Sequence, residues 1–369
     1  DASRSVTVVD SLLSENKKEL YIKNLRAEYE NIRVNHAKKR GQKAFLKIGE
    51  ARKNKIQIDW NDSTIIKPNQ LGVQLLKDFD LSKLKGFIDW TPFFQTWELH
   101  GRFPKILEDK VVGVEASRLY ADALSMLNLI VTEKWLTANA VFGLFPANSV
   151  NDDDIEIYAD ESREEILAVS NQMRQQLKKV AGASNNCLAD FIAPKETKIQ
   201  DHIGAFVVTT GLNIEKKITA FELDHDDYNS ILIKALADRL AEAFTEYLHQ
   251  HVRQEAWGYS LKEELTNEEL IKEKYKGIRP APGYPACPDH TEKETIFELL
   301  DATKNTGVAL TESLAMTPTA SVSGWFFGNE HAKYFGVGKI EKDQVESLAN
   351  RKAKDYAVME KWLSPNLNE

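Results

Sequence analysis

Apolar residues recur at helical spacing over several long stretches of the chain. Between residues 117 and 136 they fall at every third or fourth position, which is the pattern of a helix with one buried face. Residues 226–252 show the same period and begin with acidic side chains, which the positive end of a helix dipole favours. The pattern also predicts helices over residues 162–180, 266–276 and 291–303, and two short helices at the C-terminal end.

Shorter runs of β-branched, aromatic and small apolar residues, bounded by turn-forming residues, predict strands. These runs are residues 141–145, 155–158, 187–192, 205–210, 320–327 and 333–340. Strands and helices do not alternate strictly, so their order favours an α+β fold. Thr291 and Glu294 have the spacing of a capping box, so we expect a helix to begin at Thr291.

The first part of the chain has a different pattern. Residues 6–9 suggest a strand end or a loop, and residues 11–40 predict one long charged helix with only a thin apolar stripe. Residues 38–55 are strongly basic, as in a solvated helix or a linker. We therefore divide the chain into an N-terminal extension, residues 1–55, and a main domain, residues 56–369.

Composition narrows the class of protein. The chain has 369 residues, 42% of them hydrophobic, and a net charge of −8, so it can bury a large core but lacks the basic surface that nucleic-acid binding needs. No apolar run reaches the roughly 18 residues of a membrane span, so we expect no membrane partner. The two cysteines, Cys187 and Cys287, make no disulfide framework, which favours a reducing, cytoplasmic setting.

Several short motifs resemble known chemical sites, but each has a simpler structural interpretation. The acidic run at residues 224–227 contains a histidine, yet it lies where a helix N-terminus favours acids. Cys287 and His290 have a zinc-ligand spacing without a second pair, and residues 336–339 lack the full spacing of a phosphate loop. Residues 321–324 lack the first glycine of a nucleophile elbow. The sequence therefore favours binding over a visible catalytic set.

The strongest candidate for a binding site is the ribbon, which we define as the segment Arg-Pro-Ala-Pro-Gly-Tyr-Pro from Arg279 to Pro285. Each proline fixes its own φ and favours an extended residue before it, so the ribbon is predicted to be a stiff extended wall. The amides of Ala281, Gly283 and Tyr284 can then face a ligand, and the planar fork of Arg279 suits a carboxylate. The alternative interpretation is a rigid surface loop between two helices.

Arg279, Tyr284 and Tyr334, together with nearby acids, are suited to hold a small zwitterion that carries an aromatic base. At this point a family resemblance becomes visible. From about residue 65 to the end, the chain resembles the C-terminal activation module of cobalamin-dependent methionine synthase. The segments that carry the resemblance are IDWTPFF (88–94), VGVEA (112–116), GLFPAN (143–148), HDDY (225–228), ALADRLAEA (235–243), GIRPAPGYPACP (277–288), LTES (310–313) and ASVSGW (320–325).

The resemblance implies both a fold and a role. It implies a C-shaped α+β domain around a twisted antiparallel sheet, which binds S-adenosylmethionine. In the full enzyme, which moves a methyl group from methyltetrahydrofolate to homocysteine through cobalamin, this ligand remethylates oxidised cobalamin with an electron from flavodoxin or a flavoprotein reductase. Cobalamin and zinc would belong to domains whose motifs this sequence lacks. Residues 1–6 resemble the tail of the cobalamin-binding domain, which is the implied partner within the same polypeptide.

The resemblance also implies the ligand contacts. Arg279 would take the methionyl carboxylate, Asp89 or Glu242 the amino group or ribose hydroxyls, and the Ala281 backbone the adenine edge. The candidate site residues are Asp89, Glu242, Arg279, Ala281, Tyr284 and Tyr334. No protein nucleophile is needed, because cobalt is the nucleophile.

Two functions from different classes remain open at this stage. The chain is either a methyltransferase module that supplies S-adenosylmethionine to cobalamin, or a docking module for flavodoxin, a reductase or the cobalamin domain that binds no small ligand. Saturable binding of S-adenosylmethionine separates the two.

Overall fold

The computed structural model describes residues 2–40, 44–61 and 65–368. The α-helices are α1 (Ala2–Leu13), α2 (Glu15–Arg40), α3 (Ile48–Lys53), α4 (Thr91–Thr96), α5 (Gly113–Thr132), α6 (Ile214–Leu223), α7 (Asp227–His251), α8 (Asn267–Ile271), α9 (Glu292–Leu299), α10 (Ala302–Thr306), α11 (Lys342–Arg351) and α12 (Tyr356–Leu363). The strands are β1 (Gly72–Leu76), β2 (Thr137–Val150), β3 (Asp154–Tyr158), β4 (Ile166–Asn171), β5 (Asp201–Leu212), β6 (Ala309–Leu310), β7 (Met316–Thr317) and β8 (Ser321–Phe326). Short 3₁₀ turns are η2 (Leu81–Phe87), η3 (Lys105–Glu108), η4 (Leu188–Phe191), η5 (Lys195–Thr197) and η7 (Ser364–Asn366), and η6 (Val252–Ala256) is a π-helical turn.

The centre of the molecule is an antiparallel sheet in the order β4-β3-β2-β5-β8. The long strand β2 pairs with β5 along one side, while β1 and β3 share its other side. Strand β8 pairs with β5, Gly204 lying opposite Phe326. The sheet and its surrounding helices confirm the α+β prediction.

Both faces of the sheet are covered, because successive residues of a strand point to opposite sides. On β2, Phe142 and Leu144 belong to the core that α5 and α7 cover. Their neighbours Val141 and Phe145 belong to a second core, which contains residues of α9 and α10. Burial on both faces explains why these strands are almost continuously apolar rather than alternating.

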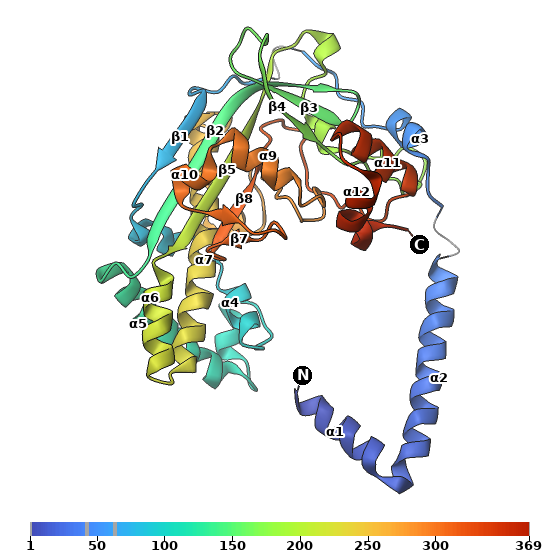
Figure 1. Ribbon diagram of the computed structural model, residues 1–369. Helices are drawn as coiled ribbons and strands as arrows, with labels where there is room; N and C mark the ends of the chain where they lie inside the picture. Colours follow the sequence, from blue (N-terminus) through green and yellow to red (C-terminus); the bar gives the residue numbers. More distant parts are fainter. Residues whose placement is uncertain (1, 41–43, 62–64, 369) are drawn as a thin grey trace.

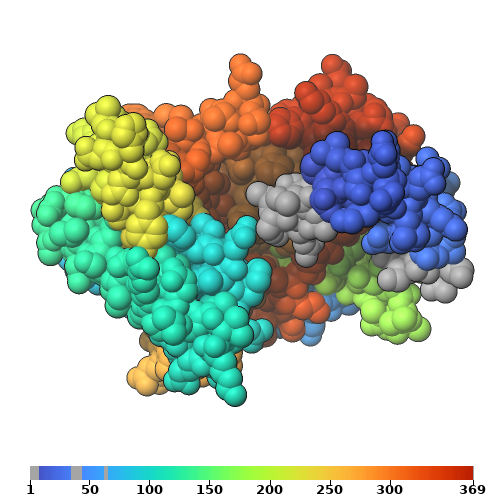
Figure 2. Space-filling view, turned by 90° about the horizontal axis from the view of Figure 1, so that it is seen from below, coloured from blue at the N-terminus to red at the C-terminus, as the bar shows by residue number. Residues whose placement is uncertain are grey.

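The helices surround the sheet unevenly, as Figure 1 shows. Helices α4 to α7 extend below the sheet on one side, and α11 and α12 lie on the other side around a third apolar cluster. Seen from below, the molecule is hollowed at its centre between these two parts (Figure 2), which gives it the expected C shape. No described helix is long and apolar enough to cross a bilayer.

Several predicted elements are confirmed. Helix α7 covers the predicted helix at 226–252, and α5 begins four residues before the predicted helix at 117–136. The predicted strands at 141–145, 155–158 and 205–210 lie within β2, β3 and β5, and the one at 320–327 corresponds to β8.

Other predictions are wrong, and distant contacts explain why. The predicted helix at 162–180 is strand β4 followed by irregular chain. In that irregular part the Arg174 amide donates to the Gln344 side chain at 2.7 Å, and the Gln344 side chain donates to the Arg174 carbonyl at 2.9 Å. A side chain 170 residues away therefore replaces the backbone partners that a helix would have supplied.

The predicted strand at 187–192 contains the 3₁₀ turn η4, whose Asp190 accepts the Cys187 amide at 2.8 Å. The predicted strand at 333–340 is irregular and contains Gly338 with φ +73°. The helix predicted over 266–276 ends at Ile271.

The helix predicted over 291–303 is split into α9 and α10, since Asp301 adopts a left-handed conformation between them. The capping box at its start does not form. Instead the Thr291 hydroxyl donates to Asp289 at 2.8 Å.

The N-terminal helices lie apart from the main body in Figure 1. Residues 6–9, which suggested a strand or a loop, are part of α1, and the long helix predicted over 11–40 is interrupted at Ser14. Helix α2 exposes Leu20, Tyr29 and Ile32, in agreement with its thin apolar stripe.

Residues 44–55, which we had placed with the linker, contact the main domain. The Leu46 amide donates to the Gln176 carbonyl at 2.8 Å, and Arg52 Nε donates to Asp153 Oδ2 at 2.7 Å. Asn54 donates to Asn185 at 2.7 Å, and Ala51 is fully buried. We therefore propose that the boundary of the main domain lies before residue 44.

Two truncations test this boundary. Deleting residues 1–43 is expected to leave the free energy of unfolding within about 1 kcal/mol of the full chain, because α1 and α2 contribute little to the buried core. Deleting residues 1–55 is expected to cost at least about 2 kcal/mol more, because it also removes the buried Ala51 and the hydrogen bonds from Arg52 to Asp153 and from Asn54 to Asn185. Urea denaturation followed by circular dichroism measures both. Equal stability of the two truncated proteins would place the boundary at residue 55 after all.

Candidate functional site

The ribbon lies beside the free edge of strand β8. Ile278 and Phe327 exchange two backbone hydrogen bonds of 3.0 and 2.9 Å, and the Trp325 amide donates to the Pro280 carbonyl at 2.9 Å. Gly324 makes this approach possible, since a Cβ atom there would lie 2.7 Å from the Pro280 oxygen. Pro280 has no amide hydrogen, so it leaves no donor unpaired. Its carbonyl accepts the hydrogen bond that the Trp325 amide at the strand edge donates.

The second half of the ribbon is a turn rather than an extended wall. The Tyr284 amide donates to the Ala281 carbonyl at 3.1 Å, and the Gly283 amide donates to the Cys287 carbonyl at 2.7 Å. The expectation that these two amides face a ligand is therefore wrong. Among the described residues the Ala281 amide has no hydrogen-bond partner, so this donor remains available.

A cavity of about 450 Å³ lies against the ribbon, a size typical of sites for small ligands. It is lined by Glu242, Glu273, Arg279, Pro280, Ala281, Tyr284, Pro285, Ala286, Val322, Tyr334 and Phe335. Five of the six candidate site residues thus meet at one cavity, although they come from α7, the ribbon and the loop before α11.

Asp89 is the candidate that does not line this cavity. Its carboxylate accepts the Thr91 amide at 2.9 Å, at the start of α4. In this structure Asp89 therefore stabilises the beginning of a short helix.

Arg279 is the cation of the cavity, and two contacts fix it. Its Nη2 donates to Glu246 Oε2 at 2.6 Å, and its backbone amide donates to the Tyr334 hydroxyl at 3.0 Å. Burial of the guanidinium would lower its pKa, but the Glu246 carboxylate outweighs burial and raises the pKa of Arg279 above its usual value. Arg279 is therefore a permanent positive charge in a fixed position.

Two carboxylates, those of Glu242 and Glu273, line the same cavity as this cation. Glu242 lies one turn before Glu246 on α7, so both project from the same side of the helix. Glu273 follows α8 in a left-handed conformation with φ +54°, and burial raises the pKa of its carboxyl group. Sequence reasoning missed Glu273 and Glu246, because no local motif marks either one.

Tyr284 and Tyr334 line the cavity but remain partly open to solvent, with 61% and 36% of their surfaces exposed. Tyr334 is fixed by the Arg279 amide and lies 3.5 Å from the Tyr275 hydroxyl. Two aromatic faces, one cation, two carboxylates and a free amide are therefore arranged around one space. This set suits a zwitterion that carries a flat polar ring.

The other motifs of the sequence have structural roles. Asp226 caps α7 by accepting the Asn229 amide at 3.0 Å, as its simpler interpretation predicted. Within the described part of the chain no group of three or more His, Cys, Asp or Glu side chains is placed to hold a metal ion. The glycines at 336–338 belong to a loop in which the Val337 amide donates to the Pro285 carbonyl at 2.8 Å.

Comparison with known proteins decides the family. The family model described as "Vitamin B12 dependent methionine synthase, activation domain" matches residues 80–353. The chain belongs to this family. The match covers most of the main domain and includes α7 and the ribbon.

A solved structure supports this assignment to the activation domains. It is described as the crystal structure of the MetH reactivation domain bound to AdoHcy. Its sequence is 54% identical, and the two structures agree with a TM-score of 0.85. The match covers 88% of this chain and 99% of the other.

The conformation of the ribbon can be tested at Gly283. This residue has φ +94°, and a Cβ atom there would lie 2.3 Å from the His290 ring. Gly283→Ala is expected to destabilise this activation domain by about 1–3 kcal/mol, because strain and a steric clash add. Thermal denaturation measures the change. The matched control is Gly49→Ala on α3, where the new Cβ meets nothing within 4 Å and stability should be unchanged or higher.

A Gly283→Ala protein as stable as the parent would show that the turn adapts at no cost. The second half of the ribbon would then be less rigid than its prolines indicate.

Proposed function

We propose that this activation domain binds S-adenosylmethionine and S-adenosylhomocysteine in the cavity between the ribbon and α7. The observation that carries the proposal is the meeting of Arg279, Glu242 and the free Ala281 amide at one cavity of suitable size. A structure 54% identical in sequence was solved with AdoHcy bound, which supports the same ligand class here.

Each part of the ligand has a complementary group. The Arg279 fork pairs with the α-carboxylate, and its fixed position lowers the entropy lost on binding. Glu242 and Glu273 accept from the amino group or the ribose hydroxyls, and their charges favour a sulfonium cation. The Ala281 amide donates to the adenine edge, and Tyr284 and Tyr334 contact the ring face.

The cavity holds its ligand but does not react with it. Its possible bases are Glu242, Glu273, Tyr284 and Tyr334. We assign the two carboxylates to the cationic groups or ribose hydroxyls of the ligand and the two tyrosines to its ring, so none of them attacks it. Bound S-adenosylmethionine supplies a methyl group to cobalamin, which the cobalamin-binding domain of the same polypeptide carries. The residues of this chain hold and orient the ligand, so that its sulfonium can be reached from outside.

We place this role in the reactivation of cobalamin-dependent methionine synthase, with flavodoxin or a flavoprotein reductase as the electron donor. The two cysteines are buried and unpaired, which supports a cytoplasmic setting. The second candidate function is a docking module without a ligand. The lined cavity favours the first, and a flat titration with S-adenosylmethionine would favour the second.

Substitution of Arg279 tests the site. Arg279→Ala is expected to weaken S-adenosylhomocysteine binding by about 2–3 kcal/mol, the scale of a lost charge-assisted pair. Arg279→Lys should restore little, because a point charge cannot replace the fork. Isothermal titration calorimetry measures both, with Arg33→Ala on the exposed side of α2 as the control. Unchanged affinity in Arg279→Ala would remove the carboxylate contact from the proposal.

The isolated chain is expected to make no methionine. The sequence lacks the motifs of the homocysteine zinc site, the folate site and the cobalt ligand, and in the described residues no metal-binding cluster is found. The assay follows methionine formed from homocysteine and methyltetrahydrofolate, with and without added cobalamin. Turnover by the pure chain would contradict a role limited to ligand presentation.

A further inference from the structure

Behind the cavity, Glu246 connects Arg279 to a second arginine. Only 7% of Glu246 is exposed, and its Oε2 accepts the Arg279 hydrogen bond of 2.6 Å. Its other oxygen, Oε1, is buried and has no hydrogen-bond partner among the described residues. The second arginine is Arg253, whose Nη1 lies 3.8 Å from Oε1.

Arg253 is fully buried at a π-helical turn that follows α7. A wider turn of this kind changes the direction of side chains relative to the preceding helix, and such turns are frequent at functional sites. The Arg253 Nε and Nη2 atoms hold the Glu263 carboxylate at 2.7 to 3.0 Å, and the guanidinium lies 4.4 Å from the centre of the Tyr275 ring. Arg253 therefore cannot easily change its position.

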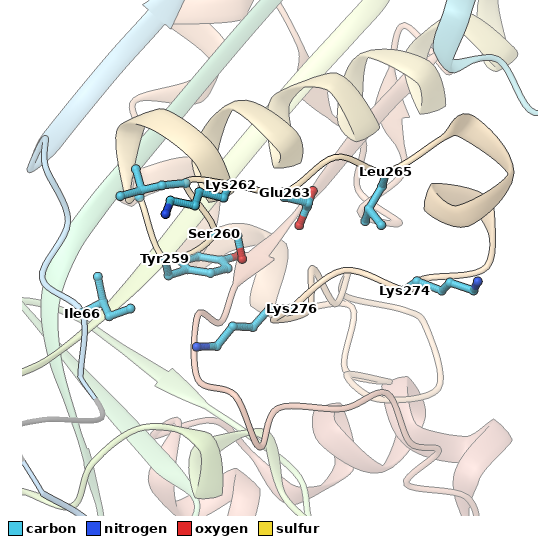
Figure 3. Close-up of a pocket in the computed structure, with 10 residues that line it drawn as sticks. Ile66, Tyr259, Ser260, Lys262, Glu263, Leu265, Lys274 and Lys276 are labelled. Atoms are coloured by element: carbon cyan, nitrogen blue, oxygen red, sulfur yellow. The ribbon is translucent and has the colours of Figure 1, made fainter.

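The other end of this chain of ion pairs reaches a second cavity. That cavity has a volume of about 580 Å³. Figure 3 shows Glu263 and Tyr259 among the residues that line it. The order of charges from one cavity to the other is Arg279, Glu246, Arg253 and Glu263, which alternates in sign. Each arginine is thus held by a carboxylate, and Glu246 is shared by both arginines.

One hydrogen bond in this chain is not made. Arg253 Nη1 is a buried donor without a partner, and Glu246 Oε1 is a buried acceptor without a partner. Buried polar groups are normally satisfied, so an unpaired donor and acceptor 3.8 Å apart call for an explanation. A small shift of the Glu246 carboxylate toward Arg253 would satisfy both groups.

We propose that Arg253 is a positioning residue for the carboxylate of the ligand and that it acts through Glu246. This inference rests on the proposed function, because the ligand carboxylate competes with Glu246 for Arg279. When the ligand pairs with Arg279, Glu246 moves toward Arg253 and closes the open hydrogen bond. Arg253 thereby keeps Glu246 from being left as an unpaired buried charge, which is strongly unfavourable.

The test compares two ligands in variants that remove this acceptor for Glu246. S-adenosylhomocysteine carries the carboxylate, and 5′-methylthioadenosine has the same nucleoside without it. The main variant is Arg253→Met combined with Glu263→Gln, so that Glu263 is not left as a buried unpaired charge. The controls are Glu263→Gln alone and Lys262→Met, which removes an exposed positive charge next to Glu263.

In the double variant, affinity for S-adenosylhomocysteine is expected to fall at least about tenfold, while affinity for 5′-methylthioadenosine stays within about threefold. Adding Glu246→Gln should then restore S-adenosylhomocysteine binding to within about threefold of the parent, because no carboxylate is left to be displaced. A residue that only supported the fold would not give this recovery. The Lys262→Met control should bind both ligands as the parent does, and Glu263→Gln alone should weaken S-adenosylhomocysteine binding less than the double variant does.

Several results would overturn the inference. These are equal weakening of both ligands, no weakening of either, or a further loss when Glu246→Gln is added. If the double variant does not fold, Arg253→Lys replaces it. Lysine keeps a positive charge for Glu263, but its single ammonium group cannot also donate a hydrogen bond to Glu246. This variant should then weaken only the ligand with the carboxylate. A parent protein that binds neither ligand would instead contradict the proposed function itself.

Discussion

The site depends on the attachment of the ribbon to the edge of the central sheet. An exposed strand edge offers unpaired amides and carbonyls, and here β8 pairs them with Ile278 and Pro280. The contact needs glycine at position 324, because a Cβ atom there would collide with the Pro280 oxygen. At position 280 it needs a residue whose backbone accepts a hydrogen bond but does not donate one. Because the ribbon is fixed in this way, Arg279 between these two residues has one position. The position of the sheet edge therefore determines the geometry of the cavity.

Helix α7 supplies the opposite charge from a second rigid element. Glu242 and Glu246 are one turn apart, so a single helix face provides one carboxylate for the cavity and one to hold Arg279. An isolated charge buried in such a place would be unfavourable, but Arg279, Glu246, Arg253 and Glu263 each lie beside a group of opposite charge. Because the backbone is rigid on both sides, the only rearrangement that we propose for accepting a zwitterion is the shift of the Glu246 carboxylate.

The sequence predicted the parts of this structure that depend on local pattern. The periodicity of α5 and α7 and the prolines of the ribbon are local signals, and residue chemistry alone named Arg279, Ala281, Tyr284 and Tyr334. Glu242 was named only because the family resemblance implies it. Glu246 and Arg253 could not be named, because their roles come from partners brought close only by the fold. The same limit explains the error at 162–180, where the Gln344 side chain takes the backbone groups of Arg174. The ligand contacts of the candidate residues remain predictions.

The open side of the cavity is informative about how the ligand is used. An enzyme that carries out its own chemistry on a bound substrate commonly closes around it to exclude water. Here Tyr284 is 61% exposed beside a ribbon that backbone hydrogen bonds hold to the sheet, so one side of the cavity is fixed and the other is accessible. Such a site suits a ligand that a second reactant on another domain must approach. In that arrangement the activation domain contributes orientation and charge, and the reacting partner arrives through the face that the fold leaves open.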